Sequence, residues 1–185
     1  MALTMKYGGI ARSELRAARR MARAARVLEH RVVRLPDMRE AQEIWGTGSA
    51  GMPATYIPGR NAVFYSIAGS LAEVVGADYI IGGHNRDDSG VFRDTSEGFF
   101  RKLQAALWQG SVALSERRTR IVRPLRERTK AEVIGLAVRL RVPLELTWSC
   151  HGDGMEHCWD CDGCRARAKA FAEAGFEDPL SPGLG

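Results

Sequence analysis

Short apolar segments typical of β-strands alternate along this 185-residue chain with longer segments in which apolar residues recur at helical spacing. Strand, helix and strand in succession favour parallel pairing, because parallel neighbours need a crossover connection. We therefore expect an α/β fold with an open, mostly parallel sheet flanked by helices. The expected strands are Ala2–Met5, His30–Leu35, Asp78–Gly83 and Ile121–Val122, and the expected helices are Ser13–Leu28, Arg60–Val75, residues 95–109 and Thr129–Leu140.

Length and composition describe an ordinary globular chain, with 45% hydrophobic and 26% charged residues. No apolar run approaches the roughly 18 residues that span a bilayer, and the first residues lack the apolar core of a signal peptide. Collagen-like, coiled-coil and largely disordered chains are excluded, and we expect a cytoplasmic protein. The length suits about one domain. We expect it to comprise an α/β part over residues 1–142 and a small cysteine-containing module over residues 143–185.

Positive charge is concentrated in residues 1–39, which hold ten Lys and Arg against three Asp and Glu. Of the 27 basic residues in the chain, 23 are Arg, which favours bidentate contacts to carboxylates or phosphates. A solvated basic helix face is the favoured interpretation, and binding of RNA or another polyanion is the minority one. No aromatic residue is interleaved with these arginines, so we do not expect direct nucleic-acid binding.

Four cysteines fall within fifteen residues, in the pattern C-x7-C-x2-C-x2-C: Cys150, Cys158, Cys161 and Cys164. Cytoplasmic proteins seldom keep disulfides, and thiolates at this spacing can converge on one tetrahedral ion. Zn²⁺ bound by four thiolates has no open position, so such a site is structural rather than catalytic. An iron–sulfur cluster is the main competitor. His151 and His157 are further potential ligands, although four cysteines suffice.

The sequence of residues 46–51, GTGSAG, matches the dinucleotide fingerprint G-x-G-x-x-G. That fingerprint has to follow a strand and open a helix. Here it follows Glu43-Ile44-Trp45, within a short helix expected over residues 37–45, and precedes Met52-Pro53. We therefore reject a Rossmann phosphate loop at this position.

Three other segments gather polar side chains where strands end or helices begin. Residues 56–61 place an Arg and an Asn in a first helical turn, where the positive helix end favours anions. Residues 84–94 form an expected polar loop after the Asp78–Gly83 strand, and ligands of open α/β sheets bind beyond the carboxyl ends of strands. Lys130 stands at a helix start just past another strand. A helix cap, a loop histidine and a solvated lysine are the alternative interpretations.

Taken together, these segments resemble the 7-cyano-7-deazaguanine synthases (QueC/ExsB type), members of the PP-loop ATP pyrophosphatase superfamily. The resemblance covers nearly the whole chain, and LELTWSC with the cysteine triplet is its most discriminating part. The HN…FRDTS version of the middle motif is similar to the archaeal-type branch. The motifs that carry the resemblance are ALTMKYGG, GMPATYIPGRN, GGHNRDDSG…FRDTSEGFF, PLRERTKAEVIGLA, VPLELTWSC and CWDCDGCRARAKAFAEAGFEDPL.

The resemblance implies an adenine nucleotide alpha hydrolase-like fold and an ATP-dependent C–N ligase of queuosine or archaeosine biosynthesis. Its implied substrates are 7-carboxy-7-deazaguanine, ammonia and ATP with Mg²⁺; one structural Zn²⁺ per chain and, as one option, a homodimer are also implied. No catalytic protein nucleophile is implied, because activation by ATP needs cations and N–H donors on phosphates. The implied ATP and substrate site is Tyr56, Gly59, Arg60, Asn61, His84, Asn85, Asp88, Asp94 and Lys130, and the implied metal ligands are Cys150, Cys158, Cys161 and Cys164.

The sequence departs from the family pattern in one place. The family's Ser-Gly-Gly-x-Asp-Ser loop, which follows a central first strand, does not occur in these 185 residues. We therefore expect the strands at Ala2–Met5 and Asp78–Gly83 to lack a shared neighbour. Three explanations stay open: the loop is encoded upstream, a separate chain supplies it, or the chain is a non-catalytic or repurposed deazaguanine-binding relative.

Overall fold

The structure is a computed structural model that describes residues 1–8, 10–38, 40 and 56–182. The chain divides into two compact units, and each is described by itself. The first unit comprises Met1–Asp37 and Lys130–Gly185, and the second comprises Met38–Thr129. The GTGSAG segment and most of the helix expected over residues 37–45 lie outside the described residues. The division expected at residue 142 stays a prediction.

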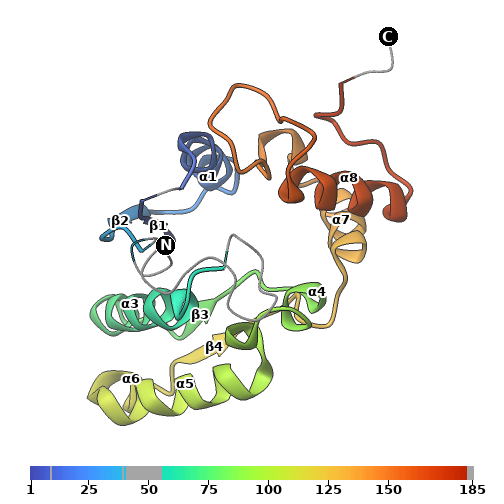
Figure 1. The fold of residues 1–185 in the computed structure, drawn as a ribbon. Helices are drawn as coiled ribbons and strands as arrows, with labels where there is room; N and C mark the ends of the chain where they lie inside the picture. The colour runs from blue at the N-terminus through green and yellow to red at the C-terminus, as the bar shows by residue number, and fades with distance from the viewer. Residues whose placement is uncertain (9, 39, 41–55, 183–185) are drawn as a thin grey trace. The chain divides into compact units, whose positions relative to one another are not determined.

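In the first unit, strand β1 (Ala2–Lys6) is followed by helix α1 (Arg12–Ala24) and strand β2 (His30–Arg34). The two strands pair in parallel, with Ala2 opposite His30 and Lys6 opposite Arg34, and α1 is their crossover (Figure 1). The helix predicted to continue to Leu28 ends four residues earlier. It ends because Arg26 adopts a left-handed conformation, with φ 51°, and the Val27 N–H turns back to the Ala22 carbonyl.

The first unit continues with helix α7 (Lys130–Arg139), the 3₁₀ turn η3 (Leu144–Leu146) and helix α8 (Asp162–Ala174). Helices α7 and α8 lie side by side in Figure 1, and Ala170 and Phe171 of α8 are buried. Helix α7 was predicted from the sequence but α8 was not, because the first turn of α8 lies within the cysteine segment, where periodicity is obscured.

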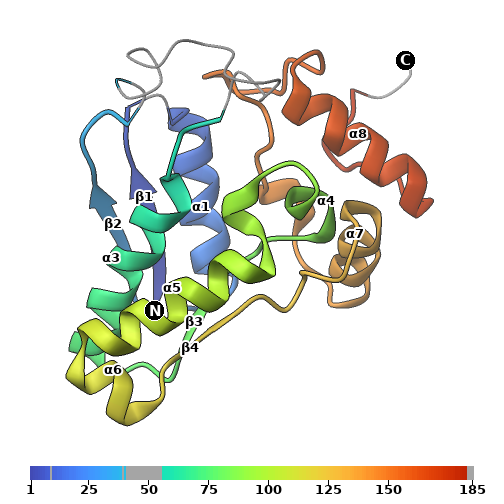
Figure 2. The ribbon, with the colours of Figure 1, turned by 60° about the horizontal axis from the view of Figure 1, so that its bottom comes forward.

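The second unit contains a parallel strand pair covered by helices (Figure 2). Strand β3 pairs with strand β4 in register from Tyr79 opposite Arg120 to Ile81 opposite Val122. Helix α3 has the bounds predicted from the sequence, because glycines flank both of its ends, whereas α4 and α6 were not predicted. The elements are α3 (Arg60–Val75), β3 (Tyr79–Ile81), α4 (Arg86–Ser89), the 3₁₀ turn η2 (Arg93–Thr95), α5 (Glu97–Gly110), α6 (Val112–Arg117) and β4 (Arg120–Val122).

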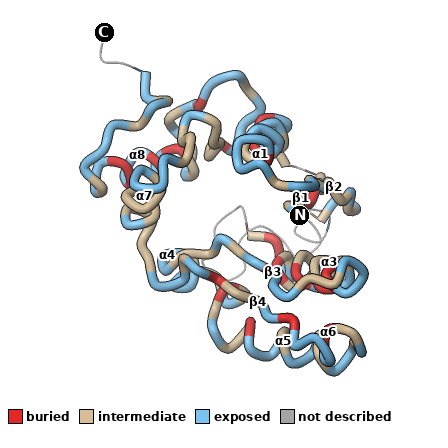
Figure 3. The backbone as a smooth tube through the Cα atoms, turned by 180° about the vertical axis from the view of Figure 1, so that it is seen from behind, coloured by how far each residue is buried: buried red, intermediate tan, exposed pale blue. Residues whose placement is uncertain are grey.

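The core of the second unit lies where α3, β3, α5 and α6 meet, and buried positions mark these elements in Figure 3. Tyr65 of α3 packs edge-on against Phe100 of α5, with ring centroids 4.8 Å apart. On the opposite face of β3, Tyr79 and Ile81 are 57% and 70% exposed. The buried members of this core are Tyr65, Ala72, Ile80, Phe100 and Leu114.

The expected α/β class with parallel strands flanked by helices is confirmed. In the described residues, however, the strands form two separate two-stranded sheets, β1–β2 and β3–β4. Thus β1 and β3 share no neighbouring strand there, as expected from the sequence. No helix of the described part of the chain is both long and apolar enough to cross a membrane.

Candidate functional site

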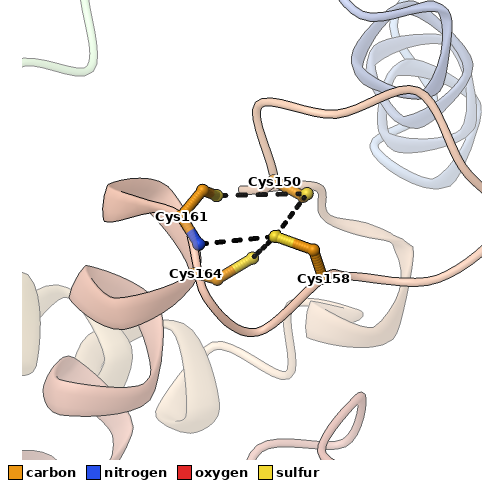
Figure 4. A group of neighbouring side chains, drawn as sticks. All are labelled: Cys150, Cys158, Cys161 and Cys164. Atoms are coloured by element: carbon orange, nitrogen blue, oxygen red, sulfur yellow. Dashed lines mark hydrogen bonds between the residues drawn. The ribbon is translucent and has the colours of Figure 1, made fainter.

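The four cysteine side chains converge in the first unit, at the start of α8 (Figure 4). Their Sγ atoms all lie within 4.8 Å of one another. Cys158 Sγ is 3.5 Å from Cys150 Sγ and 3.9 Å from Cys164 Sγ, and Cys161 Sγ is 4.0 Å from Cys150 Sγ. The arrangement brings together all four ligands predicted from the spacing.

These sulfur positions fit one tetrahedral ion. A tetrahedral site with Zn–S bonds of about 2.3 Å places neighbouring sulfurs about 3.8 Å apart. The three contacts of 3.5, 3.9 and 4.0 Å bracket that value. An iron–sulfur cluster distributes its thiolates over several iron atoms, which requires sulfurs farther apart than a single ion does. The geometry therefore favours a single metal ion with four thiolate ligands.

Backbone N–H groups point at the sulfurs and favour their ionised form. Gly152 N–H donates to Cys150 Sγ at 3.3 Å, and Cys161 N–H donates to Cys158 Sγ at 3.4 Å. Hydrogen bonds from the backbone of Asp160 and Cys161 lower the pKa of Cys158 to about 6, whereas burial raises the pKa of Cys164 to about 12. The backbone hydrogen bonds thus favour the thiolate form of Cys158.

The cysteine loop is held in place by close packing and by His157. A Cβ atom at Gly163 would lie 2.0 Å from the Ser149 carbonyl oxygen, so only glycine fits there. His157 Nε2 accepts the Ser149 N–H at 3.0 Å, and its buried ring contacts Trp148 and Trp159. The pKa of His157 is lowered mainly by burial and, to a smaller extent, by the charge of Arg167. A neutral His157 therefore supports the loop, and the four cysteines suffice as ligands.

A second contact ties this loop to α1. Ser13 Oγ donates to the Gly154 carbonyl at 2.5 Å and accepts the Gly154 N–H at 3.2 Å. Asp153 Oδ1 accepts the backbone N–H groups of Arg12 and Ser13. Asp153 thus caps the N-terminus of α1, where Ala11 offers no capping side chain. The cysteine loop and α1 are therefore expected to stabilise each other.

The other predicted site residues gather at the carboxyl end of β3, in the second unit. Asn61 N–H donates to Asp94 Oδ2, and Asn61 Nδ2 donates to the Asp94 carbonyl, both at 3.3 Å. These bonds join the first turn of α3 to η2. The charges of Arg60, Asp88 and Asp94 all act on His84, so five of the predicted residues share one local environment.

The segment predicted as the loop 84–94 contains a short helix, because Asn85 starts it. Asn85 Oδ1 accepts the N–H groups of Asp87 and Asp88, and Asp88 Oδ2 accepts the Asn85 N–H at 3.1 Å. Asn85 and Asp88 thus form a reciprocal capping box at the N-terminus of α4 (Arg86–Ser89). The loop prediction was wrong for these four residues.

His84 lies against the aromatic core of the second unit. Its ring centroid is 5.9 Å from that of Tyr65 and 5.3 Å from that of Phe100. Burial lowers the pKa of His84, so the ring is neutral at pH 7. A Cβ atom at Gly82 would lie 1.6 Å from Tyr65 Oη, which explains the glycine at the end of β3.

The structure does not bring all of the predicted residues into one group. Gly59 is the N-cap of α3, and the Tyr56 ring stacks on Phe92 with centroids 6.2 Å apart, so both belong to the second unit. Lys130 begins α7 in the first unit. Its place in the ATP and substrate site stays a prediction.

Comparison with known proteins identifies the family. Residues 1–175 match the family described as queuosine biosynthesis protein QueC. The chain belongs to the QueC family. The four convergent cysteines of this QueC chain agree with the family resemblance that its sequence motifs carry.

Individual relatives of this QueC chain are named 7-cyano-7-deazaguanine synthase. The protein from Oceanobacillus iheyensis is 34% identical over 188 residues, which cover 96% of this chain and 84% of the relative. Those from Thermoplasma volcanium and Aliarcobacter butzleri are 40% and 39% identical over 70% and 71% of this chain. The matched regions span 54% and 57% of these two relatives, about half of their length.

Two buried arginines of this QueC chain were missed by sequence reasoning. Arg123 follows β4, donates to the Thr95 carbonyl and to Glu97, and lies 4.2 Å from the Phe100 ring centroid. Arg167 of α8 forms two hydrogen bonds, at 2.6 and 2.7 Å, with the Asp178 carboxylate. The position of Arg123 directly after an apolar strand was a usable signal, whereas nothing local marks Arg167.

The capping box yields a prediction for this part of the QueC chain. Replacing Asn85 by alanine removes the acceptor for two N–H groups of α4, so the free energy of unfolding should fall by about 1 kcal/mol. Urea unfolding followed by circular dichroism measures this. Ser89→Ala, at the other end of α4, is the control and should change the unfolding free energy by less than about 0.5 kcal/mol. Equal stability of Asn85→Ala and the unmodified chain would show that the cap has no effect.

Proposed function

We propose that this chain acts in the ATP-dependent conversion of 7-carboxy-7-deazaguanine and ammonia to 7-cyano-7-deazaguanine, in queuosine or archaeosine biosynthesis. The observation that carries the proposal is the QueC match over residues 1–175. Relatives named 7-cyano-7-deazaguanine synthase support it. A cytoplasmic location and a homodimer stay predictions.

The chemistry proposed has two rounds of activation. ATP transfers its AMP part to the substrate carboxylate and releases pyrophosphate; ammonia then displaces AMP and gives the amide. A second ATP activates the amide oxygen in the same way, and loss of AMP and a proton leaves the nitrile. Both rounds need cations and N–H donors on phosphate oxygens and no protein nucleophile.

The residues at the end of β3 suit the nucleotide side of this reaction. Arg60 and Asn61 occupy the first turn of α3, whose positive end favours anions. Asp94 fixes Asn61 through the two hydrogen bonds described above. Arg60 is the proposed phosphate-binding cation of this group, and Mg²⁺ is expected to enter with ATP. A phosphate-binding role of Lys130 stays a prediction from the sequence.

The cysteine centre is proposed to bind one structural Zn²⁺. Cys150, Cys158, Cys161 and Cys164 would supply four thiolates, which leave no position for substrate. The sulfur separations of 3.5 to 4.0 Å support this assignment. The ion would fix the loop that caps α1 and would take no part in the reaction.

Removal of the Arg60 charge tests the nucleotide site. Arg60→Ala should lower kcat/KM for ATP by at least about tenfold, because a charged hydrogen bond contributes roughly 1.5–3 kcal/mol. The assay measures AMP release that depends on 7-carboxy-7-deazaguanine. Arg139→Ala, an exposed residue at the end of α7, is the control and should retain the unmodified rate. Unchanged kinetics in Arg60→Ala would place the phosphates elsewhere.

A further inference from the structure

His84 follows the end of β3 after two glycines, and its ring nitrogens are available to a bound molecule. In the parts of the chain that the structure describes, neither ring nitrogen forms a hydrogen bond or ion pair with another residue. No side-chain nitrogen there is both buried and without a partner, so the two ring nitrogens of His84 contact solvent. A ligand at the carboxyl end of β3 can therefore reach them.

The aromatic core of the second unit holds the His84 ring in place. Tyr65 of α3 and Phe100 of α5 both contact the ring, and their own rings pack edge-on against each other. A Cβ atom at Gly82 would lie 3.4 Å from His84 Cδ2, so the backbone of the strand end also lies close to the ring. A side chain that is positioned by packing loses little freedom when a reactant binds, which favours catalysis.

The other groups near His84 that could accept a proton have structural tasks. The Asp88 carboxylate accepts a backbone N–H in the capping box of α4, and the Asp94 carboxylate accepts a backbone N–H of the first turn of α3. Carboxylates are also weaker bases than imidazole in general. Burial raises the pKa of Tyr65 to about 12, so its hydroxyl stays protonated at pH 7. His84 is therefore the best proton acceptor of this group.

The charges around His84 leave its ring neutral at pH 7. Burial is the largest influence and lowers the pKa of His84. Asp88 and Asp94 raise this pKa, whereas Arg123 and Arg60 lower it, and the result lies below the ordinary value of 6.5. A neutral imidazole keeps a lone pair on one nitrogen and can take up one proton.

The proposed reaction releases a proton close to the nucleotide phosphate. In its last step the amide oxygen is bonded to the phosphorus of AMP, and the nitrogen loses its proton. The electron pair of that N–H bond forms the third C–N bond, while the C–O bond breaks and AMP leaves with the oxygen and its electron pair. One oxygen atom separates the phosphorus from the reacting carbon. A phosphate held by Arg60 thus places that carbon in the surroundings that Arg60 shares with His84.

We propose that His84 is the general base of the nitrile-forming step, an inference that rests on the proposed function. Its ring nitrogen takes the N–H proton of the adenylated amide as AMP departs, and the imidazolium then passes the proton to solvent. The charges of Asp88 and Asp94 favour the imidazolium. Arg60 holds the phosphate of the departing AMP. His84 thus adds a catalytic residue to a site in which the sequence implied only binding residues.

Conversion of the amide of 7-carboxy-7-deazaguanine to the nitrile, with ATP, isolates this step. His84→Asn should lower kcat about a hundredfold or more, which is the usual contribution of a general base. KM for ATP should change by less than about twofold, because the phosphate stays on Arg60. Added imidazole should restore part of the rate of His84→Ala, which a merely structural role would not produce. His30→Asn, in β2 of the first unit, is the matched control and should keep the unmodified kcat.

The pH profile gives a second readout that requires no variant. The kcat of the unmodified chain should fall about tenfold per pH unit below the pKa of His84, because protonated His84 cannot accept the proton. This acid limb should lie below pH 6.5. The profile of His84→Asn should lack it. Melting temperatures verify that each variant is folded.

Failure of the base and failure of the proposed function have different signatures. If folded His84→Asn forms the nitrile at the unmodified rate, or if the acid limb is absent from the unmodified chain, His84 is not the base, while the function stands. If the unmodified chain forms no nitrile from the amide, either alone or with a designed N-terminal extension that carries a Ser-Gly-Gly-x-Asp-Ser loop, the proposed function itself fails.

Discussion

Replacement of Cys164 by serine will abolish stoichiometric zinc binding and unfold the cysteine loop. Cys164 is fully buried, and its Sγ lies 3.9 Å from Cys158 Sγ. Structural zinc contributes an apparent free energy of roughly 10–16 kcal/mol to the folding of small zinc modules at pH 7. We therefore expect Cys164→Ser to lower the free energy of unfolding of the first unit by more than about 3 kcal/mol. Atomic absorption measures zinc per chain, and urea unfolding measures the stability.

The same substitution should also loosen α1, because Asp153 and Gly154 of the cysteine loop hold its N-terminus. Faster hydrogen exchange in α1 would report this coupling. Asp160→Asn is the control. Asp160 is an exposed residue of the same loop, and the substitution keeps the hydrogen bond from its backbone N–H to Cys158. A Cys164→Ser chain that keeps one zinc and its urea midpoint would contradict a four-thiolate structural site.

Asp178→Ala is expected to destabilise the first unit by about 3–5 kcal/mol, because it leaves a buried guanidinium without its counter-charge. The Arg167 and Asp178 side chains are 6% and 5% exposed. Arg167 also donates to Thr147 Oγ1 at 2.6 Å, so the pair joins α8 to the segment before the cysteines. Urea unfolding at pH 7 measures the loss.

This ion pair also predicts a pH dependence. Burial is the largest single influence and raises the pKa of Asp178, but the hydrogen bonds from Arg167 and from the Leu180 N–H, together with the charge of Arg167, outweigh it and leave the pKa below its ordinary value. A lowered folded-state pKa stabilises the protein above the ordinary aspartate pKa, and this contribution is lost as the pH falls through the lower value. The stability difference between the unmodified chain and Asp178→Ala should therefore narrow below about pH 4.

Arg165→Ala is the control for the buried pair. Its partners Asp160 and Asp162 are exposed, so this variant should lose less than about 1 kcal/mol. If Asp178→Ala is as stable as Arg165→Ala at pH 7, the buried pair does not hold the C-terminal segment as described.

Features with a local signal were predictable from the sequence. Gly59 and Gly76 flank α3 and marked its two ends. The apolar segments predicted the ends of β1 to β4 to within two residues. The spacing of the cysteines was sufficient to predict a common ligand set, because cysteines this close together in the sequence can bind one ion.

Features that depend on distant partners were not predictable. Asp153 caps α1 from about 140 residues away, and Arg167 meets Asp178 only because the chain turns after α8. The strained Trp159 lies within a motif whose cysteines dominated the interpretation. For Asp153, Arg167 and Trp159, the partner or the backbone conformation comes from the tertiary fold. Arg123, by contrast, directly follows an apolar strand, and this usable signal was overlooked because the following proline had marked the segment only as a strand end.

The central claim, that this QueC chain makes a nitrile from an acid and ammonia, is tested most directly by isotope transfer. The zinc-loaded chain is incubated with 7-carboxy-7-deazaguanine, ATP and ¹⁵N-ammonium, alone and with a designed N-terminal extension that carries a Ser-Gly-Gly-x-Asp-Ser loop. Mass spectrometry should detect 7-cyano-7-deazaguanine with one ¹⁵N atom and two AMP per product in at least one of the two forms. Absence of labelled nitrile from both forms, each with one zinc per chain, would contradict the proposed function.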